Sequence, residues 1–424
     1  MYFFEGNIFE VEALKNPVTA TIEIPGSKSH TNRALVMAAL TKGVVTLHNP
    51  LYSEDTEVMI SCLRTLGLQI ETASDQIIVY DEISTIPNKF SELFVKDSGT
   101  TLRFLSALLC LTSGTQVIKG NTRLNERPIK GLIDALRFLG AKIEYLEKEG
   151  QPPLKIHPSL CTKNEVSIDA SMSSQFLSAL LLIAPFLNGV TIHPINGVLS
   201  KPYVDMTIHG MHEWGIEISQ GEKGEYFIPA GQSYQKKSYY IEGDYSSAGY
   251  FFAIAALTKS TITLNNLNPS SVQADRKFLD ILASMGNKIT MHEQAITIYG
   301  KGTIPLTINM EDCPDQVQTL AVLAAFSKGI TKISGVRSLR LKETERVQAL
   351  KNELAKMGIH AEDTHDTLTI YGGEPRGATI DTYGDHRMAM AFAVAVKKLP
   401  GMKICHPEVV NKTFPTFWDQ LQLL

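Results

Sequence analysis

The sequence has few cysteines, no long uncharged apolar run and no excess of positive charge. Its five cysteines form no CxxC pair and have no histidines at metal-ligand spacing, so the sequence indicates neither a zinc site nor a disulfide framework. No segment reaches about 18 uncharged apolar residues, and the N-terminal stretch carries Glu5 and Glu10 where a signal peptide has basic residues. We therefore expect a protein of the reducing cytoplasm that enters no membrane.

The charge balance and the missing motifs exclude further classes. A net charge of −4 over 424 residues gives no electrostatic case for nucleic acid or for an anionic membrane surface. The phosphate-binding loop GxxxxGK[ST], the glycine-rich dinucleotide fingerprint and any clear Ser/His/Asp or Cys/His constellation are all missing. Anion binding, if the chain performs it, has to come from local clusters of residues.

A repeat is the strongest positive feature of the chain. Six segments each place a small polar cluster before an Ala/Leu-rich helix pattern, and they align when six residues 68 to 75 positions apart are superposed: Arg33, Arg103, Gln175, Tyr250, Gln318 and Met388. Free N–H groups and the dipole make a helix N-terminus an anion site. Several such termini brought together would suit a ligand with several negative charges.

Each repeat is expected to form a βαβαββ unit, and six units divide into three plus three. The last repeat has only half a unit of chain after it, whereas about half a unit precedes the first. We infer that the N-terminal segment completes the second lobe. The predicted lobes are 1–23 with 241–424, and 24–240, and the chain crosses between them near 22–25 and near 239–242.

Taken singly, the polar clusters have simple structural explanations. PGSKSHTNRAL is also typical of a capped helix start, and LKETERVQALKNELAKMG is also typical of an amphipathic helix with Lys342 and Arg346 on its solvent face. Asp315, Glu343 and His386 are the acid/base candidates, and ordinary ion pairing is the alternative for each. The functional interpretation gains weight because the cations recur with the repeat.

Nine motifs in order resemble the 5-enolpyruvylshikimate-3-phosphate synthase family, from about Ile24 to Pro415. They are PGSKSxxNRAL, SGTTxR, NERPI, SSQFLSALLL, SKPYVDMT, EGDYSSA, KETER, GDHRMAMA and NKTFP. The resemblance implies an α/β fold of two lobes, each an inside-out α/β barrel of three βαβαββ units that closes on its ligands. It also implies the substrates phosphoenolpyruvate and shikimate 3-phosphate, no metal, no cofactor, and a monomer.

The family's ligand contacts carry over motif by motif. The resemblance implies a phosphoenolpyruvate subsite of Lys28, Gly99, Arg127, Gln175, Arg346, Arg387 and Lys412. It implies a shikimate 3-phosphate subsite of Ser29, Arg33, Ser173, Ser174, Ser200, Tyr203, Asp315 and Lys342, and further substrate contacts from Thr100, Arg103 and Ser338. Arginine forks suit carboxylate and phosphate, and serine hydroxyls suit a second phosphate.

The implied reaction is an addition followed by an elimination. The 5-hydroxyl of shikimate 3-phosphate attacks C2 of phosphoenolpyruvate while C3 is protonated, and phosphate then leaves. The resemblance assigns Asp315 as base toward the hydroxyl and Lys28 and Glu343 as proton donor and acceptor, in either order. It assigns His386 as support for Glu343, and charge stabilisation to Lys412 and the arginines.

Asp97 and Ser338 depart from the family pattern, since asparagine is usual at both positions. Asp97 adds a negative charge beside the phosphoenolpyruvate subsite, so we expect weaker anion binding unless Lys96 or Arg103 pairs with it. Gly99 leaves room there, which predicts sensitivity to the phosphonate inhibitor glyphosate. Two alternatives remain: a paralogue that binds anions without turnover or uses another acceptor, and a transferase acting on UDP-N-acetylglucosamine. The latter typically has SGAKN and a loop cysteine, which this sequence lacks.

Overall fold

The computed structural model describes residues 3–4, 7–86 and 88–424 and divides into two compact units. The continuous unit runs from Gly26 to Ile241, and the discontinuous unit combines Met1–Pro25 with Glu242–Leu424. Residues 1–2 and 5–6 of the predicted segment 1–23 lie outside the described residues. The expected hinges at the two crossings stay a prediction.

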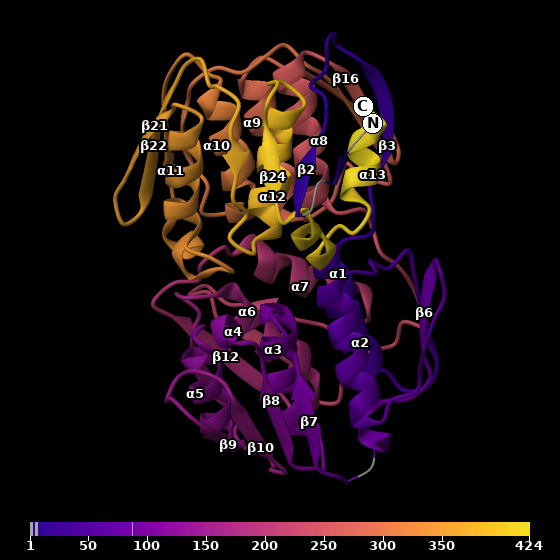
Figure 1. Cartoon of the computed structure of the whole chain (residues 1–424). Helices are drawn as coiled ribbons and strands as arrows, with labels where there is room; N and C mark the ends of the chain where they lie inside the picture. The colour runs from indigo at the N-terminus through magenta and orange to yellow at the C-terminus, as the bar shows by residue number, and fades with distance from the viewer. Residues whose placement is uncertain (1–2, 5–6, 87) are drawn as a thin grey trace. The chain divides into compact units, whose positions relative to one another are not determined.

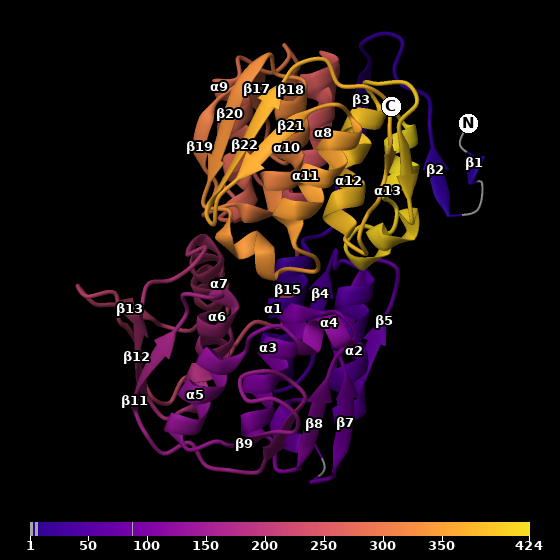
Figure 2. The same cartoon turned by 60° about the vertical axis from the view of Figure 1, so that its left-hand side comes forward.

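Three four-stranded sheets belong to the continuous unit, and each has two parallel strands followed by antiparallel ones (Figure 2). Parallel neighbours require a crossover, which a helix provides in this fold. The sheet orders are β15(Ser238–Tyr240)-β4(Val45–His48)-β6(Gln76–Val79)-β5(Ile70–Thr72), β7(Ser91–Phe94)-β8(Gln116–Lys119)-β10(Leu154–His157)-β9(Lys142–Tyr145) and β11(Glu165–Asp169)-β12(Val190–Ile195)-β14(Tyr226–Ile228)-β13(Ser219–Gln220).

Three sheets of the same pattern belong to the discontinuous unit. Their orders are β3(Thr19–Glu23)-β16(Thr261–Asn265)-β18(Ala295–Tyr299)-β17(Lys288–Met291), β19(Thr307–Asn309)-β20(Gly329–Ser334)-β22(Thr367–Gly372)-β21(His360–Asp363) and β23(Thr379–Ile380)-β24(Lys403–Cys405)-β2(Ile8–Glu10)-β1(Phe3–Phe4). The six sheets and their crossover helices confirm the predicted α/β class with six repeated units.

Two of the sheets take their first strand from a segment that is distant in the sequence from their other three strands. β3 precedes the helix of the first repeat in the sequence, yet it pairs in parallel with β16 of the fourth repeat (Figure 1). β15 in turn pairs in parallel with β4 of the first repeat. The β-like runs at 19–24 and 239–241 are therefore strands as predicted, but each completes the sheet of a different repeat from the one it precedes.

The first helix of each repeat lies at the centre of its unit. In the continuous unit α1 (Lys28–Ala39), α3 (Gly99–Leu108) and α6 (Ser174–Ile183) contact one another, as do α8 (Tyr245–Thr258), α10 (Val317–Ala325) and α12 (His386–Val396) in the discontinuous unit. Because neighbours cover these helices on all sides, the residues that follow each polar start are mostly apolar and are buried around the whole circumference. The other helices are α2 (Glu54–Leu66), α4 (Thr122–Asn125), α5 (Lys130–Leu139), α7 (Pro202–Glu213), α9 (Lys277–Ser284), α11 (Arg346–Lys356) and α13 (Phe417–Gln422).

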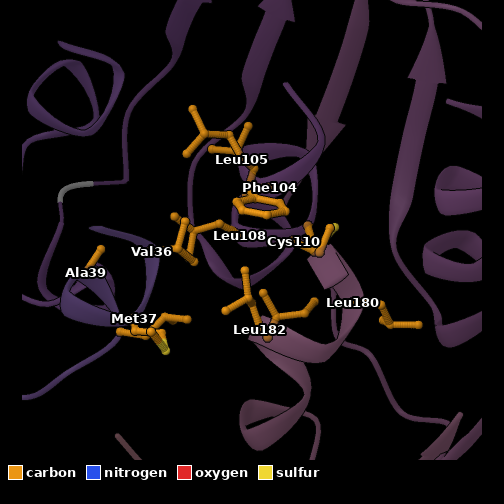
Figure 3. Packing of buried hydrophobic residues seen from close by; sticks show 14 of the residues in the cluster. Val36, Met37, Ala39, Phe104, Leu105, Leu108, Cys110, Leu180 and Leu182 are labelled. Carbon is orange, nitrogen blue, oxygen red and sulfur yellow. The ribbon is translucent and has the colours of Figure 1, made fainter. Parts of the chain in front are cut away.

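Each unit has its own hydrophobic core. In the continuous unit Met37 of α1, Phe104 and Leu108 of α3 and Leu182 of α6 gather at the centre (Figure 3). The discontinuous unit packs the corresponding faces of α8, α10 and α12 around residues such as Phe251. The polar clusters at the helix starts thus stand on well-packed elements. Within the described part of the chain, no helix is long and apolar enough to cross a membrane.

Candidate active site

Lys28 occupies the first position of α1, after the cap residue Ser27. The Ser27 side chain accepts a hydrogen bond from the backbone N–H of His30 at 3.5 Å, so this cluster does cap the helix. The Lys28 ammonium also forms a salt bridge to Asp55 in the first turn of α2, with Nζ 3.0 Å from Oδ2. Sequence reasoning missed Asp55, because SEDTEV resembles any acidic first helical turn.

Arg33 joins α1 to α7. Its guanidinium donates to Thr207 Oγ1 at 2.8 Å and to the backbone oxygens of Ser29 at 3.1 Å and Tyr203 at 3.0 Å. Burial lowers the pKa of Arg33 to about 10, so the group is still charged at neutral pH. Three of the predicted shikimate 3-phosphate contacts, Ser29, Arg33 and Tyr203, are therefore held together in the structure.

Gly99 lies against two guanidinium groups. A Cβ at this position would stand 2.5 Å from Nη1 of Arg103 and 2.8 Å from Nη1 of Arg127. Arg103 donates to the Gly99 and Pro128 carbonyl oxygens, both at 3.0 Å, whereas the buried Nε of Arg127 has no hydrogen-bond partner among the described residues. Two like charges at the N-terminus of α3 favour an anion there.

The start of α6 is linked to the start of α3. Ser173 caps α6 by accepting from the backbone N–H of Gln175 at 3.3 Å, and Ser174 is the first residue of the helix. Gln175 Nε2 donates to Thr100 Oγ1 at 3.1 Å, and the buried Gln175 Oε1 has no partner in the part of the chain that the structure describes. The structure therefore brings Gln175 and Thr100 together with Gly99, which precedes Thr100 in α3.

Two further predicted residues lie near these helix starts. Ser200 precedes α7 in the left-handed conformation, with φ of 53°. Asp97, the departure from the family pattern, accepts a hydrogen bond from Asn121 Nδ2 at 2.7 Å. A neutral amide thus binds the Asp97 carboxylate, and the expectation that Asp97 weakens anion binding unless Lys96 or Arg103 pairs with it stays a prediction.

In the discontinuous unit, Arg346 is the centre of a carboxylate cluster. It binds Asp385 in two-point fashion at 2.7 and 3.2 Å, Glu343 at 2.8 Å and Asp315 at 3.4 Å. Arg346 is only 1% exposed. Burial acts to lower its pKa, but the charges of Asp385, Glu343 and Asp315 outweigh burial and raise the pKa above its ordinary value.

Arg387 holds the other side of Asp315. Its Nη2 lies 2.7 Å from Asp315 Oδ2, and its Nη1 donates to the Tyr250 hydroxyl at 3.2 Å. Burial raises the pKa of Tyr250 to about 12, so the hydroxyl stays protonated at neutral pH. Asp315, in the 3₁₀ turn Pro314–Gln316, is thus oriented by two guanidinium groups.

Glu343 connects Arg346 to the C-terminal cation Lys412. Lys412 Nζ lies 3.3 Å from Glu343 Oε1, while Oε2 of the same carboxylate contacts Arg346. His386 begins α12, and its Nδ1 lies 3.7 Å from Asp385 Oδ1. The structure therefore gathers the predicted residues Asp315, Glu343, Arg346, His386, Arg387 and Lys412.

The expectation that LKETER forms the first turn of an amphipathic helix is wrong. The helix α11 begins at Arg346, because the Glu345 side chain accepts from the Gln348 backbone N–H and caps it there. Lys342 lies before the helix with extended backbone, at the end of the 3₁₀ turn Arg337–Leu341. Lys342 and Arg346 consequently share no helical face. Ser338 lies in the same turn, and its buried hydroxyl has no partner among the residues described.

Asp275 is a buried carboxylate near this cluster that no motif identified. It lies in the 3₁₀ turn Ala274–Arg276, is 4% exposed and accepts a hydrogen bond from the Ser246 hydroxyl. Burial, and then the negative charge of Asp315, raise the pKa of Asp275 to about 7. The sequence around it, SSVQADRKF, differs little from an ordinary helix start, so no signal in this sequence alone could have singled it out.

Both units therefore present cations on helix starts, and one unit adds oriented carboxylates. Such groups can bind phosphate and carboxylate, and they can exchange protons with a bound ligand. Within residues 3–4, 7–86 and 88–424, no group of three or more His, Cys, Asp or Glu side chains is arranged to hold a metal ion. The fold and these clusters define an α/β protein that handles small anionic ligands.

Comparison with known proteins identifies the family. A family model described as EPSP synthase (3-phosphoshikimate 1-carboxyvinyltransferase) matches residues 13–421. The chain is 40% identical to proteins named 3-phosphoshikimate 1-carboxyvinyltransferase from Sulfurovum sp. over 415 residues and from Vibrio vulnificus over 413 residues, with 96% of each chain covered. The chain belongs to the EPSP synthase family.

A solved structure shows the same fold. The EPSP synthase from Acinetobacter baumannii superposes with a TM-score of 0.81 over 98% of both chains, at 22% sequence identity. This likeness, together with the six repeated sheets, confirms the fold class predicted from the repeats.

Proposed function

We propose that this chain transfers the carboxyvinyl group of phosphoenolpyruvate to the 5-hydroxyl of shikimate 3-phosphate and releases phosphate, a step toward aromatic amino acids. The observation that carries the proposal is the pair of cation clusters: Arg103 and Arg127 around Gly99, and Arg346 with Arg387 around Asp315. Two anionic substrates require several fixed positive charges, and such charges are most effective where water is excluded.

The ligand assignments follow the family motifs. Phosphoenolpyruvate is assigned to Lys28, Gly99, Arg127, Gln175, Arg346, Arg387 and Lys412, and shikimate 3-phosphate to Ser29, Arg33, Ser173, Ser174, Ser200, Tyr203, Asp315 and Lys342. The unpartnered Nε of Arg127 and Oε1 of Gln175 support the first assignment, because a buried polar atom without a partner is costly until a ligand fills it.

In the proposed chemistry, Asp315 accepts the proton of the 5-hydroxyl as that oxygen bonds to C2 of phosphoenolpyruvate. A proton is added at C3, which gives a tetrahedral intermediate. Loss of a proton from C3 then restores the double bond as the C2–O bond to phosphate breaks. Lys28 and Glu343 are the proton donor and acceptor at C3, in either order, and each has an ionic partner that favours its charged form before the proton moves: Asp55 for Lys28 and Lys412 for Glu343.

The test is phosphate release by the purified protein with phosphoenolpyruvate and shikimate 3-phosphate, beside a reaction in which UDP-N-acetylglucosamine replaces shikimate 3-phosphate. We expect release with shikimate 3-phosphate only. Release with the nucleotide sugar alone, or silence from a folded protein with both acceptors, would reject the proposal. Silence would favour a paralogue that binds anions without this turnover.

A further inference from the structure

Glu353 is a buried carboxylate that the proposed chemistry does not use. It lies on α11 with a fully buried side chain. Its Oε2 accepts from the backbone N–H of Asp381 at 3.0 Å and lies 2.7 Å from Lys356 Nζ. Its Oε1 accepts from the Tyr383 hydroxyl at 2.7 Å. Burying a carboxylate is costly unless its oxygens are satisfied, and an apolar side chain would fill this position more cheaply.

Apart from Lys356, which lies on α11 itself, the groups that Glu353 binds belong to one short turn, residues 381–385. This turn joins β23 to the start of α12. Tyr383 and Gly384 are consecutive left-handed residues, with φ of 53° and 66°. A tyrosine rarely adopts this conformation, and such a residue persists only where its surroundings hold it there.

Contacts from α11 supply that restraint. The Tyr383 hydroxyl donates to Glu353, and Asn352 Nδ2 lies 3.3 Å from the same hydroxyl. Burial, and then the hydrogen bond to Glu353, raise the pKa of Tyr383 to about 12, so the donor is present throughout the neutral range. The turn is therefore fastened to α11 through both its backbone and its strained residue.

The turn ends at the residue that organises the cation cluster. Asp385 binds Arg346 in two-point fashion and caps α12 by accepting from the Arg387 backbone N–H at 2.8 Å. Arg346 and Glu353 are seven residues apart on α11, which places them on one face two turns apart. One helix thus holds both ends of the turn, with Arg346 at Asp385 and Glu353 at Asp381 and Tyr383.

We propose that Glu353 is a positioning residue for the phosphoenolpyruvate-binding cations Arg346 and Arg387. It acts by fixing the turn 381–385, so that Asp385 meets Arg346 with both oxygens and α12 starts where Arg387 reaches Asp315. The inference rests on the proposed function for the identity of the ligand. The contacts by which Glu353 holds the turn 381–385, called the clamp below, do not depend on which ligand binds.

The kinetic test compares Glu353→Leu, Glu353→Gln and Tyr383→Phe with the matched control Tyr371→Phe. Tyr371 also donates its hydroxyl to a glutamate, Glu362 at 3.1 Å, but both of these side chains are exposed. We expect Glu353→Leu to raise the KM for phosphoenolpyruvate at least tenfold and Tyr383→Phe at least threefold, with the KM for shikimate 3-phosphate changed less than twofold. Glu353→Gln keeps an acceptor for Asp381 and a partner for Tyr383, so it should return to within threefold of the unchanged protein.

The outcomes separate positioning from plain stabilisation. If Glu353→Leu and Tyr383→Phe lower only the melting temperature and leave the KM for phosphoenolpyruvate unchanged, the inference is wrong. If Glu353→Leu does not fold, Tyr383→Phe decides by the same criterion.

A second measurement does not depend on turnover. Hydrogen exchange of the unliganded protein should show at least tenfold faster exchange at the backbone amides of 385–388 in Glu353→Leu, and none of this acceleration in Tyr371→Phe. If the unchanged protein releases no phosphate, the proposed function fails, and exchange alone tests the clamp. Equal protection at 385–388 in Glu353→Leu and the unchanged protein would overturn it.

Discussion

Gly99 shows how a single missing side chain shapes a site. Any Cβ there would approach Arg103 Nη1 and Arg127 Nη1 to less than 3 Å, so both guanidinium groups would have to move. The absence of a side chain at position 99 therefore determines both the free space at the start of α3 and the positions of the two guanidinium groups. The same space and charges are the physical reason to expect that a small phosphonate competes with phosphoenolpyruvate here.

We predict that Gly99→Ala raises the KM for phosphoenolpyruvate and weakens inhibition by glyphosate, each by at least tenfold. The methyl group displaces the guanidinium groups that both anions use. Steady-state kinetics with and without glyphosate measure both effects. Inhibition that stays the same in the alanine variant would remove Gly99 from the anion site.

Arg127→Ala is predicted to raise the KM for phosphoenolpyruvate at least tenfold, equivalent to about 1.4 kcal/mol of binding free energy. The reason is that the Arg127 guanidinium lies at the start of α3, and its buried Nε has no hydrogen-bond partner among the described residues. Arg123→Ala is the matched control, since Arg123 lies four residues earlier and pairs with Glu126 on the surface. Equal KM values in the two variants would place the anion elsewhere.

Lys28→Met is predicted to reduce kcat at least a hundredfold, because it removes one of the two groups that exchange protons with C3 in the proposed chemistry. Asp55→Asn keeps the ammonium but removes this carboxylate partner, so we expect a smaller loss of kcat. The measurement is the rate of phosphate release for both variants. Turnover unchanged in Lys28→Met would refute the assignment.

Residue types that recur within motifs could be predicted from the sequence, whereas their partners could not. Arg33, Arg103 and Arg387 each stand in a polar cluster of the repeat, and within each unit these clusters lie at the starts of central helices that contact one another. Asp55 and Asp275 carry no such mark. Their importance comes from burial and from distant neighbours, Lys28 and Asp315, that only the folded chain brings close.

At the level of elements, the starts of the central helices carry the polar groups. A helix buried on every side leaves only its terminus for polar residues, and the unsatisfied N–H groups there need acceptors. Asp385 and Ser173 provide such caps for α12 and α6. Asp385 has a second task, since the same carboxylate also holds Arg346.

Asp385→Asn is predicted to separate these two tasks. Asparagine is also a good cap, so α12 should keep its start, while Arg346 loses a two-point ionic partner. We expect the free energy of unfolding to fall by about 1–3 kcal/mol, measured by urea denaturation. Asp381→Asn, an exposed neutralisation in the same turn, is the control and should change it by less than about 0.5 kcal/mol. Equal effects would show that the charge of Asp385 is unimportant.

The sequence predicted where the central helices lie more accurately than it predicted the first residue of a helix near a charged motif. The repeat predicted all six central helices because each is a long apolar run after a polar cluster. The periodicity of LKETERVQALKNELAKMG, in contrast, placed Lys342 on the helix that became α11, and this is wrong. Periodicity does not distinguish a side chain that caps a helix from one that continues it. Glu345 decides the start of α11 by bonding to the Gln348 backbone N–H.

For the whole molecule, the division into three plus three units was predictable from the spacing of the repeats, and the N-terminal segment was already expected to complete the second lobe. The sequence did not predict which strands β3 and β15 pair with, namely β16 and β4. Their sequences fit a strand in either sheet. The pairing is decided by which partner the crossing chain reaches. The expected monomeric state and the hinges remain predictions.

The stability of the whole protein should depend on pH through Asp275. Its pKa is raised from an ordinary value of 3.8 to about 7, so the folded protein binds this proton more tightly than the unfolded chain does. Stability from this group is complete below about pH 4 and is lost as pH rises toward 7. Asp275→Asn should remove a decline of about 1 kcal/mol per pH unit over that range. Urea denaturation from pH 4.5 to 7.5, with exposed Asp280→Asn as the control, measures it. Parallel curves for Asp275→Asn and the unchanged protein would contradict the prediction.

The pairing of β3 with β16 sets an order for synthesis on the ribosome. Glu23 of β3 is opposite Asn265 of β16, so the strand emerges long before its neighbour exists. At about 5–20 residues per second the wait is roughly 12–48 s. During that interval the whole continuous unit, residues 26–241, leaves the ribosome and can fold. During synthesis β3 therefore has to stay unpaired and soluble until β16 of its own unit is made, which gives chaperones that bind extended segments a defined target.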